Sequence, residues 1–276
     1  MLKKRLIFTL LYSDGQFMLS RNFRLQKVGN LRWLQTNYNF SLISFSIDEL
    51  IVLDVTRGEK KHDEFCAALK LLTEGCFVPI AAGGGVRTIA TARNLLRSGA
   101  DKVVVNSAFY ENNGFISELA SEFGQQCVVA SMDIKSSPDG TYQAWSECGS
   151  QCQPGAAANW IERVTQDVIG ELYLNSMDRD GTGQGYDLRL LDLLPANMTN
   201  PVILAGGVGN ASHLAAGLAD PRVDAVATAH LFNFVGDGLK QARQSLISGG
   251  VVLPLWDIQL LEQHLRAEVT SEVMLD

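Results

Sequence analysis

Long apolar runs and concentrations of positive charge are both missing from this sequence of 276 residues. No stretch approaches the roughly 20 apolar residues that a membrane-spanning helix needs, so we expect no membrane span. Lysine and arginine form a run only at residues 3–5, and the formal net charge is -7, which argues against a face that binds nucleic acid. The short apolar run 6–12 is followed by Ser13-Asp14-Gly15 instead of a small-residue cleavage site, which favours a buried first strand over a secretion signal.

Cysteine is also scarce. The chain has five cysteines, at positions 66, 76, 127, 148 and 152. An odd number spread over so long a chain is typical of reduced thiols, and we expect a cytoplasmic protein. Cys148 and Cys152 form the only close pair, and no second cluster of cysteine or histidine completes a set of four ligands. The sequence therefore predicts no metal site, and we expect no cofactor.

The sequence does contain ample material for one large core. Apolar residues make up 46% and charged residues 19%, and the length is ordinary for a single α/β barrel. Short apolar runs recur, each followed by a glycine-marked turn and a segment of helical period. The predicted strands are residues 6–11, 49–55, 78–82, 102–106, 128–133, 171–175, 202–205 and 225–229. Apolar strands that alternate with helices indicate a parallel sheet, and eight such units favour a (β/α)8 TIM barrel over an open doubly wound sheet.

The chain contains an internal repeat that favours the barrel. Residues 79–88 match residues 201–210, and 201 minus 79 is 122. The same offset relates two further pairs of segments: 48–50 with 170–172, and 101–103 with 223–225. A duplicated four-strand unit closes naturally into an eightfold barrel, whereas an open sheet has no reason to repeat in this way.

The repeat also suggests how the chain is divided. We predict one barrel over residues 1–253, built from two homologous half-barrels at about 1–122 and 123–253. From Pro254 onward, leucines recur at helical spacing, so residues 254–276 predict an added amphipathic C-terminal helix.

Glycines end the third and seventh predicted strands, at the rim where such barrels carry their sites. Backbone N–H groups approach a phosphate closely where no side chain intervenes, so we predict phosphate binding at Gly84 and Gly85 and at Gly206 and Gly207. One such turn alone would more simply be a tight bend that needs positive φ, but two turns related by the repeat suit a substrate with phosphate at both ends. Further hydrogen-bond donors at this rim are Asn106 and Ser107.

Carboxylates near strand ends are the candidates for acid–base catalysis: Asp54, Asp133, Asp178 and Asp180. Asp133 closes an otherwise apolar run, so partial desolvation can raise its pKa toward a useful range. The alternative for Asp133 is a helix cap or a partner for Lys135. The repeat makes residue 11 the counterpart of Asp133, since 133 minus 122 is 11, and that residue is Leu11.

A series of motifs in chain order carries a family resemblance: Met1-Leu-Lys-Lys-Arg5, Asp48-Glu-Leu-Ile-Val-Leu-Asp54, Gly83-Gly-Gly-Val-Arg87, Gly99-Ala-Asp-Lys-Val-Val-Val-Asn106-Ser107, Glu122-Phe-Gly-Gln-Gln-Cys-Val-Val, Asn175-Ser-Met-Asp-Arg-Asp-Gly-Thr182, Gly185-Tyr-Asp187 and Ala205-Gly-Gly-Val-Gly209. From residue 1 to about residue 253, the chain resembles the HisF family, the cyclase subunit of imidazole glycerol phosphate synthase. So many matches in order are specific, because ordinary barrel similarity would supply only the glycine turns.

The resemblance implies a barrel that receives ammonia from a separate glutaminase subunit and uses it on a bisphosphorylated ribonucleotide at the opposite rim. In the family a ring of charged residues gates the ammonia, and the matching positions are Arg5, Glu49, Lys102 and Glu171. Acids and bases at strand starts can pair around a narrow polar constriction, although the same pattern also serves plain stabilisation of the bottom layer. Asp101 matches a position that faces the glutaminase. The resemblance adds three substrate contacts: Asn175, Gly181 and His230.

The sequence departs from the family at the upper rim. The two catalytic aspartates correspond to Leu11 and Asp133, and a substrate-contacting lysine corresponds to Leu19. A leucine neither gives nor takes a proton, and losing one positioned acid or base typically costs about 10²–10⁴ in rate. Leu10-Leu11 and Asn175-Ser176 instead resemble HisF-like paralogues associated with surface-saccharide synthesis, which are thought to supply ammonia to a sugar amidotransferase.

We therefore predict a paralogue that partners a glutaminase and has impaired cyclase activity. One alternative is an authentic cyclase subunit of histidine biosynthesis, and another is a phosphate-binding barrel of a different class, such as an isomerase.

Overall fold

Parallel strands at the centre of the molecule close into a barrel. A computed structural model describes residues 3–37, 43–74, 76–112, 114–166, 168–229 and 238–255. Within this part of the chain the barrel strands are β1 (Arg5–Ser13), β4 (Glu49–Asp54), β5 (Ile80–Gly83), β6 (Lys102–Val105), β7 (Val128–Ser136), β10 (Glu171–Ser176), β11 (Val202–Ala205) and β12 (Ala225–Thr228). Each pairs in parallel with the next, and the pairings of β7 with β10 and of β12 with β1 complete the circle. The predicted (β/α)8 TIM barrel is confirmed.

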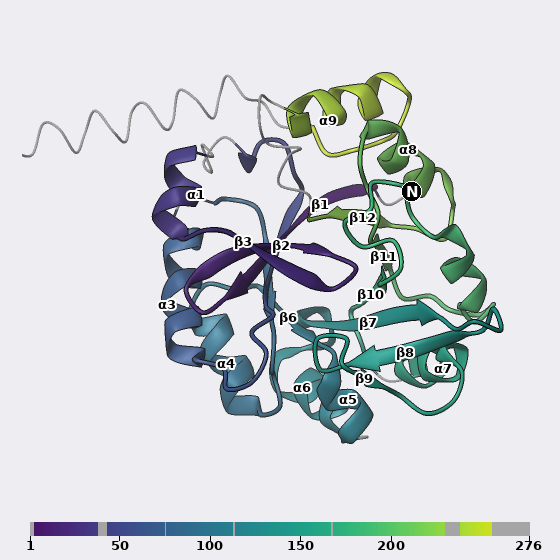
Figure 1. The fold of residues 1–276 in the computed structure, drawn as a ribbon, viewed down its shortest axis with the longest axis horizontal. Helices are drawn as coiled ribbons and strands as arrows, with labels where there is room; N and C mark the ends of the chain where they lie inside the picture. The colour runs from purple at the N-terminus through teal and green to yellow at the C-terminus, as the bar shows by residue number, and fades with distance from the viewer. Residues whose placement is uncertain are drawn as a thin grey trace, which may run out of the picture.

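Helices surround the strands, as Figure 1 shows. Their bounds are α1 (Leu31–Asn37), α3 (His62–Thr73), α4 (Ile89–Arg97), α5 (Ser107–Glu111), α6 (Phe115–Phe123), α7 (Ala157–Gln166), α8 (Ala211–Ala219) and α9 (Gly238–Ser248), with 3-10 turns η1 (Gln125–Cys127) and η2 (Leu188–Leu193). None of the described helices is both long and apolar enough to cross a membrane.

Alternation along each strand divides the core into two layers. In β1, Leu6, Phe8 and Leu10 belong to the cluster that includes buried helix residues, whereas Ile7 belongs to a second cluster inside the barrel. Because successive side chains of a strand point to opposite faces and both faces are covered, the strand is a nearly continuous apolar run. This double burial explains why the barrel strands are readable from sequence.

Two antiparallel hairpins lie outside the predicted pattern. After β1 the chain forms β2 (Gln16–Arg21) and β3 (Arg24–Gly29), which pair with each other. Beyond Asp133, β7 continues to Ser136 and pairs with β8 (Tyr142–Ser146), which in turn pairs with β9 (Gln151–Cys152). Figure 1 shows the β2–β3 hairpin in front of the barrel strands.

Strand register shows the internal repeat directly. Ile7 lies opposite Glu49 in the β1–β4 pair, and Val129 lies opposite Glu171 in the β7–β10 pair, so both partners differ by 122. Leu11 is therefore the structural counterpart of Asp133.

The repeat shifts by one residue at the last strand, where the sequence-derived offset was wrong. Leu6 pairs with Val226 and its counterpart Val128 pairs with Val103, and 226 minus 103 is 123. Asp224 is thus the counterpart of Asp101. Their carboxylates confirm this: Asp101 accepts the N–H of Ile80, and Asp224 accepts the N–H of Val202. One additional residue precedes β12.

Two predicted features fall on undescribed residues. His230 lies outside the described ranges, as do residues 256–276, which make up nearly all of the expected C-terminal helix. These assignments stay predictions.

Candidate functional site

A cavity of about 370 Å³ opens at the carboxyl ends of the barrel strands. Both Leu11 and Asp133 line it, from β1 and β7 respectively. Residues predicted for phosphate or substrate binding that also line it are Gly84, Gly85, Asn106, Ser107, Asn175, Gly181, Gly206 and Gly207. The described candidates for substrate binding therefore converge on one space.

Asp133 lies at the polar wall of this cavity. Asn106 Nδ2 donates to its Oδ2 at 3.1 Å, and Asn175 Nδ2 donates to its Oδ1 at 2.8 Å. Burial raises the pKa of Asp133 to about 7, against the lowering effect of the Asn175 hydrogen bond and with a further rise from the charge of Asp180. A carboxyl with this pKa exchanges protons readily near neutral pH.

The two glycine turns admit no side chain. Gly84 has φ +114°, and a Cβ there would lie 2.2 Å from the carbonyl oxygen of Asp54. Gly206 has φ +90°, and a Cβ there would lie 2.6 Å from the carbonyl oxygen of Ser176, the residue 122 positions after Asp54. Glycine permits this backbone conformation and this approach, which leaves the turns open for an anion to contact the main chain.

Asp180 fastens the β2–β3 hairpin. Its Oδ2 accepts Ser20 Oγ at 2.5 Å and the N–H of Phe23 at 2.9 Å, and its own carbonyl accepts the N–H of Asn22. The hairpin brings Leu19 and Phe23 to the cavity wall. Asp180 also lines the cavity, but its carboxylate accepts the hydrogen bonds that hold the β2–β3 hairpin in place.

Asp178, the third predicted acid, has a different position. Its Oδ2 accepts the N–H and the hydroxyl of Ser136 at 2.7 and 2.8 Å, and Asp178 is absent from the cavity wall. The geometry gives it a bracing contact to β7, and catalysis by Asp178 has no support from its position.

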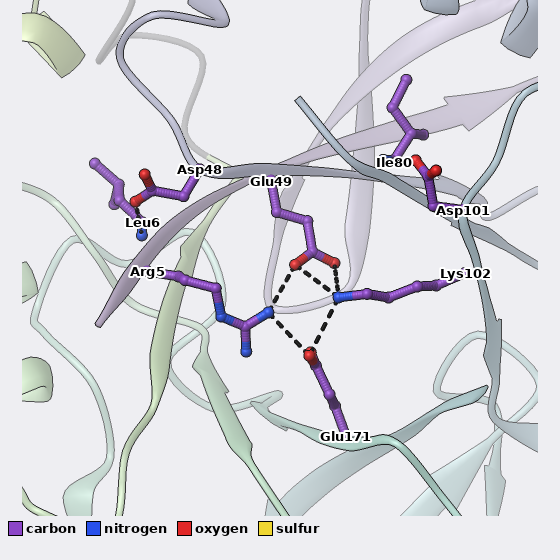
Figure 2. Close-up of polar contacts among 8 residues, drawn as sticks. All are labelled: Arg5, Leu6, Asp48, Glu49, Ile80, Asp101, Lys102 and Glu171. Carbon is purple, nitrogen blue, oxygen red and sulfur yellow. Dashed lines mark hydrogen bonds and ion pairs between the residues drawn. The ribbon is translucent and has the colours of Figure 1, made fainter. Parts of the chain in front are cut away.

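At the opposite end of the barrel, four charged side chains form a closed ring (Figure 2). Arg5 Nη1 lies 2.8 Å from Glu49 Oε2 and 2.9 Å from Glu171 Oε1. Lys102 Nζ lies 2.9 Å from Glu49 Oε1 and 3.1 Å from Glu171 Oε1. These residues start β1, β4, β6 and β10, so the ring surrounds the barrel axis. We call it the charged ring.

Between the charged ring and the cavity lies an apolar layer. It is the inner cluster: Ile7, Ile51, Ala81, Val104, Val129, Tyr173, Ile203, Ala205, Ala225 and Ala227. Above it, Thr9 Oγ1 and Tyr173 OH approach to 3.4 Å, and both residues line the cavity floor. The barrel interior thus runs from charges, through an apolar layer and a pair of hydroxyls, to the cavity.

Comparison with known proteins gives this arrangement a family. The model for the family described as "Histidine biosynthesis protein" matches residues 40–236. A candidate imidazole glycerol phosphate synthase subunit hisF2 from Parasynechococcus marenigrum (strain WH8102) is 45% identical over 244 residues, which cover 88% of this chain and 90% of the relative. The imidazole glycerol phosphate synthase subunit HisF of Alkaliphilus metalliredigens (strain QYMF) is 34% identical over 247 residues, covering 89% of this chain and 96% of that protein. The chain belongs to the HisF family.

Membership of the HisF family directs attention to Asp101, the predicted partner contact. Asp101 is exposed and directly precedes β6, and its carboxylate accepts the N–H of Ile80 at 2.8 Å. In Figure 2 it lies beside the charged ring, on the Lys102 side. Asp101 is therefore accessible at the face formed by the starts of the barrel strands, and its hydrogen bond with Ile80 also has a structural role.

Several cavity residues of this HisF-family chain were missed from sequence. They are basic side chains on the cavity wall: Arg21, Arg24, Arg57, Lys60 and Arg87. Arg87 stands in one of the recognised glycine motifs, and Lys60 follows a strand end, so position relative to strands could have indicated these two. Arg21 and Arg24 reach the wall only because the unpredicted β2–β3 hairpin folds over the barrel.

Proposed function

We propose that this chain is the acceptor subunit of a glutamine-dependent complex. It takes ammonia from a glutaminase of the HisH type through the charged ring, and its upper cavity holds a phosphorylated small molecule. Its own cyclase chemistry is impaired, and the ammonia serves the amidation of a surface sugar by a further enzyme. The observation that carries the proposal is the contrast between a complete ring at one end and Leu11 opposite Asp133 at the other.

The face around the charged ring supports a protein partner. Large exposed apolar side chains lie close to the starts of barrel strands: Phe77 precedes β5 and Val168 precedes β10, with 45% and 46% of their surfaces exposed. Val252 is 61% exposed, and its carbonyl accepts the N–H of Lys4 beside β1. Apolar residues gathered on one rim favour an interface over a fully solvated surface.

The chemistry of the ring favours passage of a small polar molecule. Glu49 is 2% exposed and shares its two oxygens between Arg5 and Lys102, so the carboxylate is neutralised inside the barrel mouth. Glu171 Oε2 is buried and accepts no hydrogen bond from any described residue. A free buried acceptor at a constriction is a suitable contact for the N–H of ammonia.

Loss of the second acid supports divergence from cyclisation. Ring closure in the family relies on two carboxylates, and the counterpart of Asp133 is the aliphatic Leu11. The relative that is 45% identical carries the numbered subunit name hisF2, which is compatible with a specialised second member of the family.

The test is reconstitution with a HisH-type glutaminase. The purified chain should form a stable complex and stimulate glutamine hydrolysis. Lys102→Gln should uncouple hydrolysis from delivery of ammonia to the acceptor, whereas Arg93→Gln, which removes an exposed ion pair with Glu122, should leave coupling intact. Failure of the chain to form a complex would end the proposal.

An authentic cyclase is the second candidate, favoured by one observation: Asp133 has a pKa of about 7, suited to proton transfer. This candidate requires turnover of the bisphosphorylated ribonucleotide with ammonium salt alone. No turnover at saturating ammonium, with binding of the ribonucleotide demonstrated, would remove it.

A further inference from the structure

The middle of the cavity wall differs between the two halves of the barrel, whereas the glycine turns at the two ends of the cavity correspond to each other. Leu11 lies opposite Leu53 in the β1–β4 pair, and Asp133 lies opposite Asn175 in the β7–β10 pair. Since 133 minus 11 and 175 minus 53 are both 122, the two pairs are structural counterparts. All four residues line the cavity. One half-barrel therefore presents two leucines where the other presents a carboxylate and an amide.

Strand order fixes how these pairs lie relative to the glycine turns. Around the barrel the strands follow the order β1, β4, β5, β6, β7, β10, β11, β12. The leucine pair comes from β1 and β4, the glycines 84–85 follow β5, the polar pair comes from β7 and β10, and the glycines 206–207 follow β11. Three strands lie between β5 and β11 on either side of the barrel, so the two glycine turns lie opposite each other, and the two pairs face each other across the line that joins the turns.

The β2–β3 hairpin extends the apolar wall. Leu19 and Leu25 line the same cavity, and both are only partly buried. Leu19 also packs against the main core, which holds it in place. These leucines can shield aliphatic carbon from water, and each methylene so covered improves binding about fourfold.

The polar wall selects for the opposite chemistry. Both oxygens of Asp133 are held by amide donors from Asn106 and Asn175, which fix the carboxylate on the wall. A carboxylate retains further lone pairs and accepts hydrogen bonds from hydroxyl or N–H groups. A leucine wall, by contrast, leaves a ligand hydroxyl without a partner.

We propose that this cavity binds a molecule with a phosphate at each end and a two-sided middle. The phosphates lie at the turns of Gly84–Gly85 and of Gly206–Gly207. The connecting chain has a deoxygenated or methyl-bearing edge against Leu11 and Leu53, and a hydroxyl- or N–H-bearing edge against Asp133 and Asn175. The inference deepens the proposed function, on which it rests for the phosphorylated ligand, and it excludes a fully hydroxylated chain as the preferred occupant.

The cation content of the wall supports an anionic occupant. Arg21 and Arg24 line the cavity and form no ion pair with any residue that the structure describes. The guanidinium of Arg57 donates to main-chain carbonyls, those of Phe23 at 2.7 Å and Cys148 at 3.5 Å, and neither contact is with a carboxylate. These charges can attract a ligand with two phosphates.

The test compares two probes of equal chain length by calorimetry: hexane-1,6-diyl bisphosphate and mannitol 1,6-bisphosphate. Each probe matches only one wall of the unmodified protein, so the quantity measured is the ratio of the two affinities. Leu11→Asp combined with Leu53→Asn copies the polar wall onto the apolar one, and should shift the affinity ratio toward the hydroxylated probe by at least about tenfold. Leu11→Asn alone should shift the ratio in the same direction, and it serves if the double variant does not fold.

A control variant separates the binding of the phosphates from the preference for one kind of connecting chain. Gly85→Ala, whose Cβ would meet only the side chains of Lys60 and His62, should weaken both probes alike and leave their ratio unchanged. An equal ratio in the unmodified protein and in the Leu11 variants would overturn the inference, as would failure of both probes to bind. Either result would leave the ammonia route standing if the glutaminase complex forms. Conversely, if no glutaminase complex forms but the binding of the probes is selective, the ammonia route is refuted and the inference about the cavity stands.

Discussion

Leu11 on β1 and Asp133 on β7 occupy equivalent positions 122 residues apart, and both side chains line the same cavity. One can transfer a proton and the other cannot. The charged ring beneath them contains all four residues expected from the family. The barrel thus has a complete charged ring at one end and a single carboxylate at the two equivalent positions at the other, and each end can be probed separately.

The charged ring should contribute to the stability of the fold, in addition to the passage of ammonia that we propose for it. Lys102→Met removes one of the two cations beside Glu49 and leaves that buried carboxylate less compensated. We expect a loss of about 2–4 kcal/mol in the free energy of unfolding, measured by denaturant titration. Arg93→Met, which breaks the exposed pair with Glu122, should cost less than about 1 kcal/mol. Equal losses would show that the ring is no more than a surface feature.

Stability should depend on pH through Asp133. Its folded pKa of about 7 lies above the ordinary value of 3.8, so between these pH values the folded state binds a proton that the unfolded chain has released. Stability from this group is therefore present at low pH and declines as pH rises toward 7. An asparagine does not titrate, so the free energy of unfolding of Asp133→Asn, relative to that of the unmodified chain, should rise by about 1–3 kcal/mol from pH 5 to pH 8. Glu118→Gln, on the exposed side of α6, should give no such difference in the same titrations.

The two hairpins should respond to different aspartates. Asp180→Ala removes the acceptor for Ser20 and for the N–H of Phe23, so amide hydrogen exchange should rise across residues 20–24. Asp178→Ala removes the acceptor for Ser136 and should raise exchange around residues 134–137 instead. If each variant loosened both hairpins alike, the separate bracing roles would be wrong.

The glycine turns allow a test matched for backbone conformation. Gly84 and Gly58 both have positive φ, +114° and +95°, but a Cβ at Gly84 would meet the Asp54 carbonyl at 2.2 Å, whereas a Cβ at Gly58 would meet nothing within 4 Å. Gly84→Ala should lose more than about 2 kcal/mol in unfolding free energy, and Gly58→Ala only about 1 kcal/mol. Thermal unfolding of both variants measures the difference, and a milder effect at Gly84 would contradict the described turn.

The barrel could be predicted from sequence because its strands are buried on both faces. Runs such as residues 49–54 need apolar side chains at nearly every position, and the repeat gives the register between the halves. The hairpins escaped prediction because their strands are less apolar than the barrel strands, although turn residues mark their starts: Asp14-Gly15 after β1, and Pro138-Asp139-Gly140 between β7 and β8. The turn between β2 and β3 has no glycine signal, because Asn22 and Phe23 adopt positive φ there.

The site residues could be predicted from the sequence where the barrel strands position them, and not where the hairpins do. Asp133 and the glycine turns follow from strand ends and from the repeat, since these positions depend on the barrel alone, whereas the charged ring was expected from the family resemblance. The basic residues Arg21 and Arg24, and the bracing roles of Asp178 and Asp180, depend on how the hairpins fold over the mouth. The single-residue shift before β12 likewise lies in a connection, where length is less constrained than register within a strand.

The most direct test of the account is turnover of the bisphosphorylated ribonucleotide with ammonium salt by the unmodified chain and by Leu11→Asp. If Leu11 occupies the position of a missing acid, Leu11→Asp should raise the rate at least about 10²-fold over a very slow unmodified chain. Efficient turnover by the unmodified chain, unchanged by Leu11→Asp, would contradict the account.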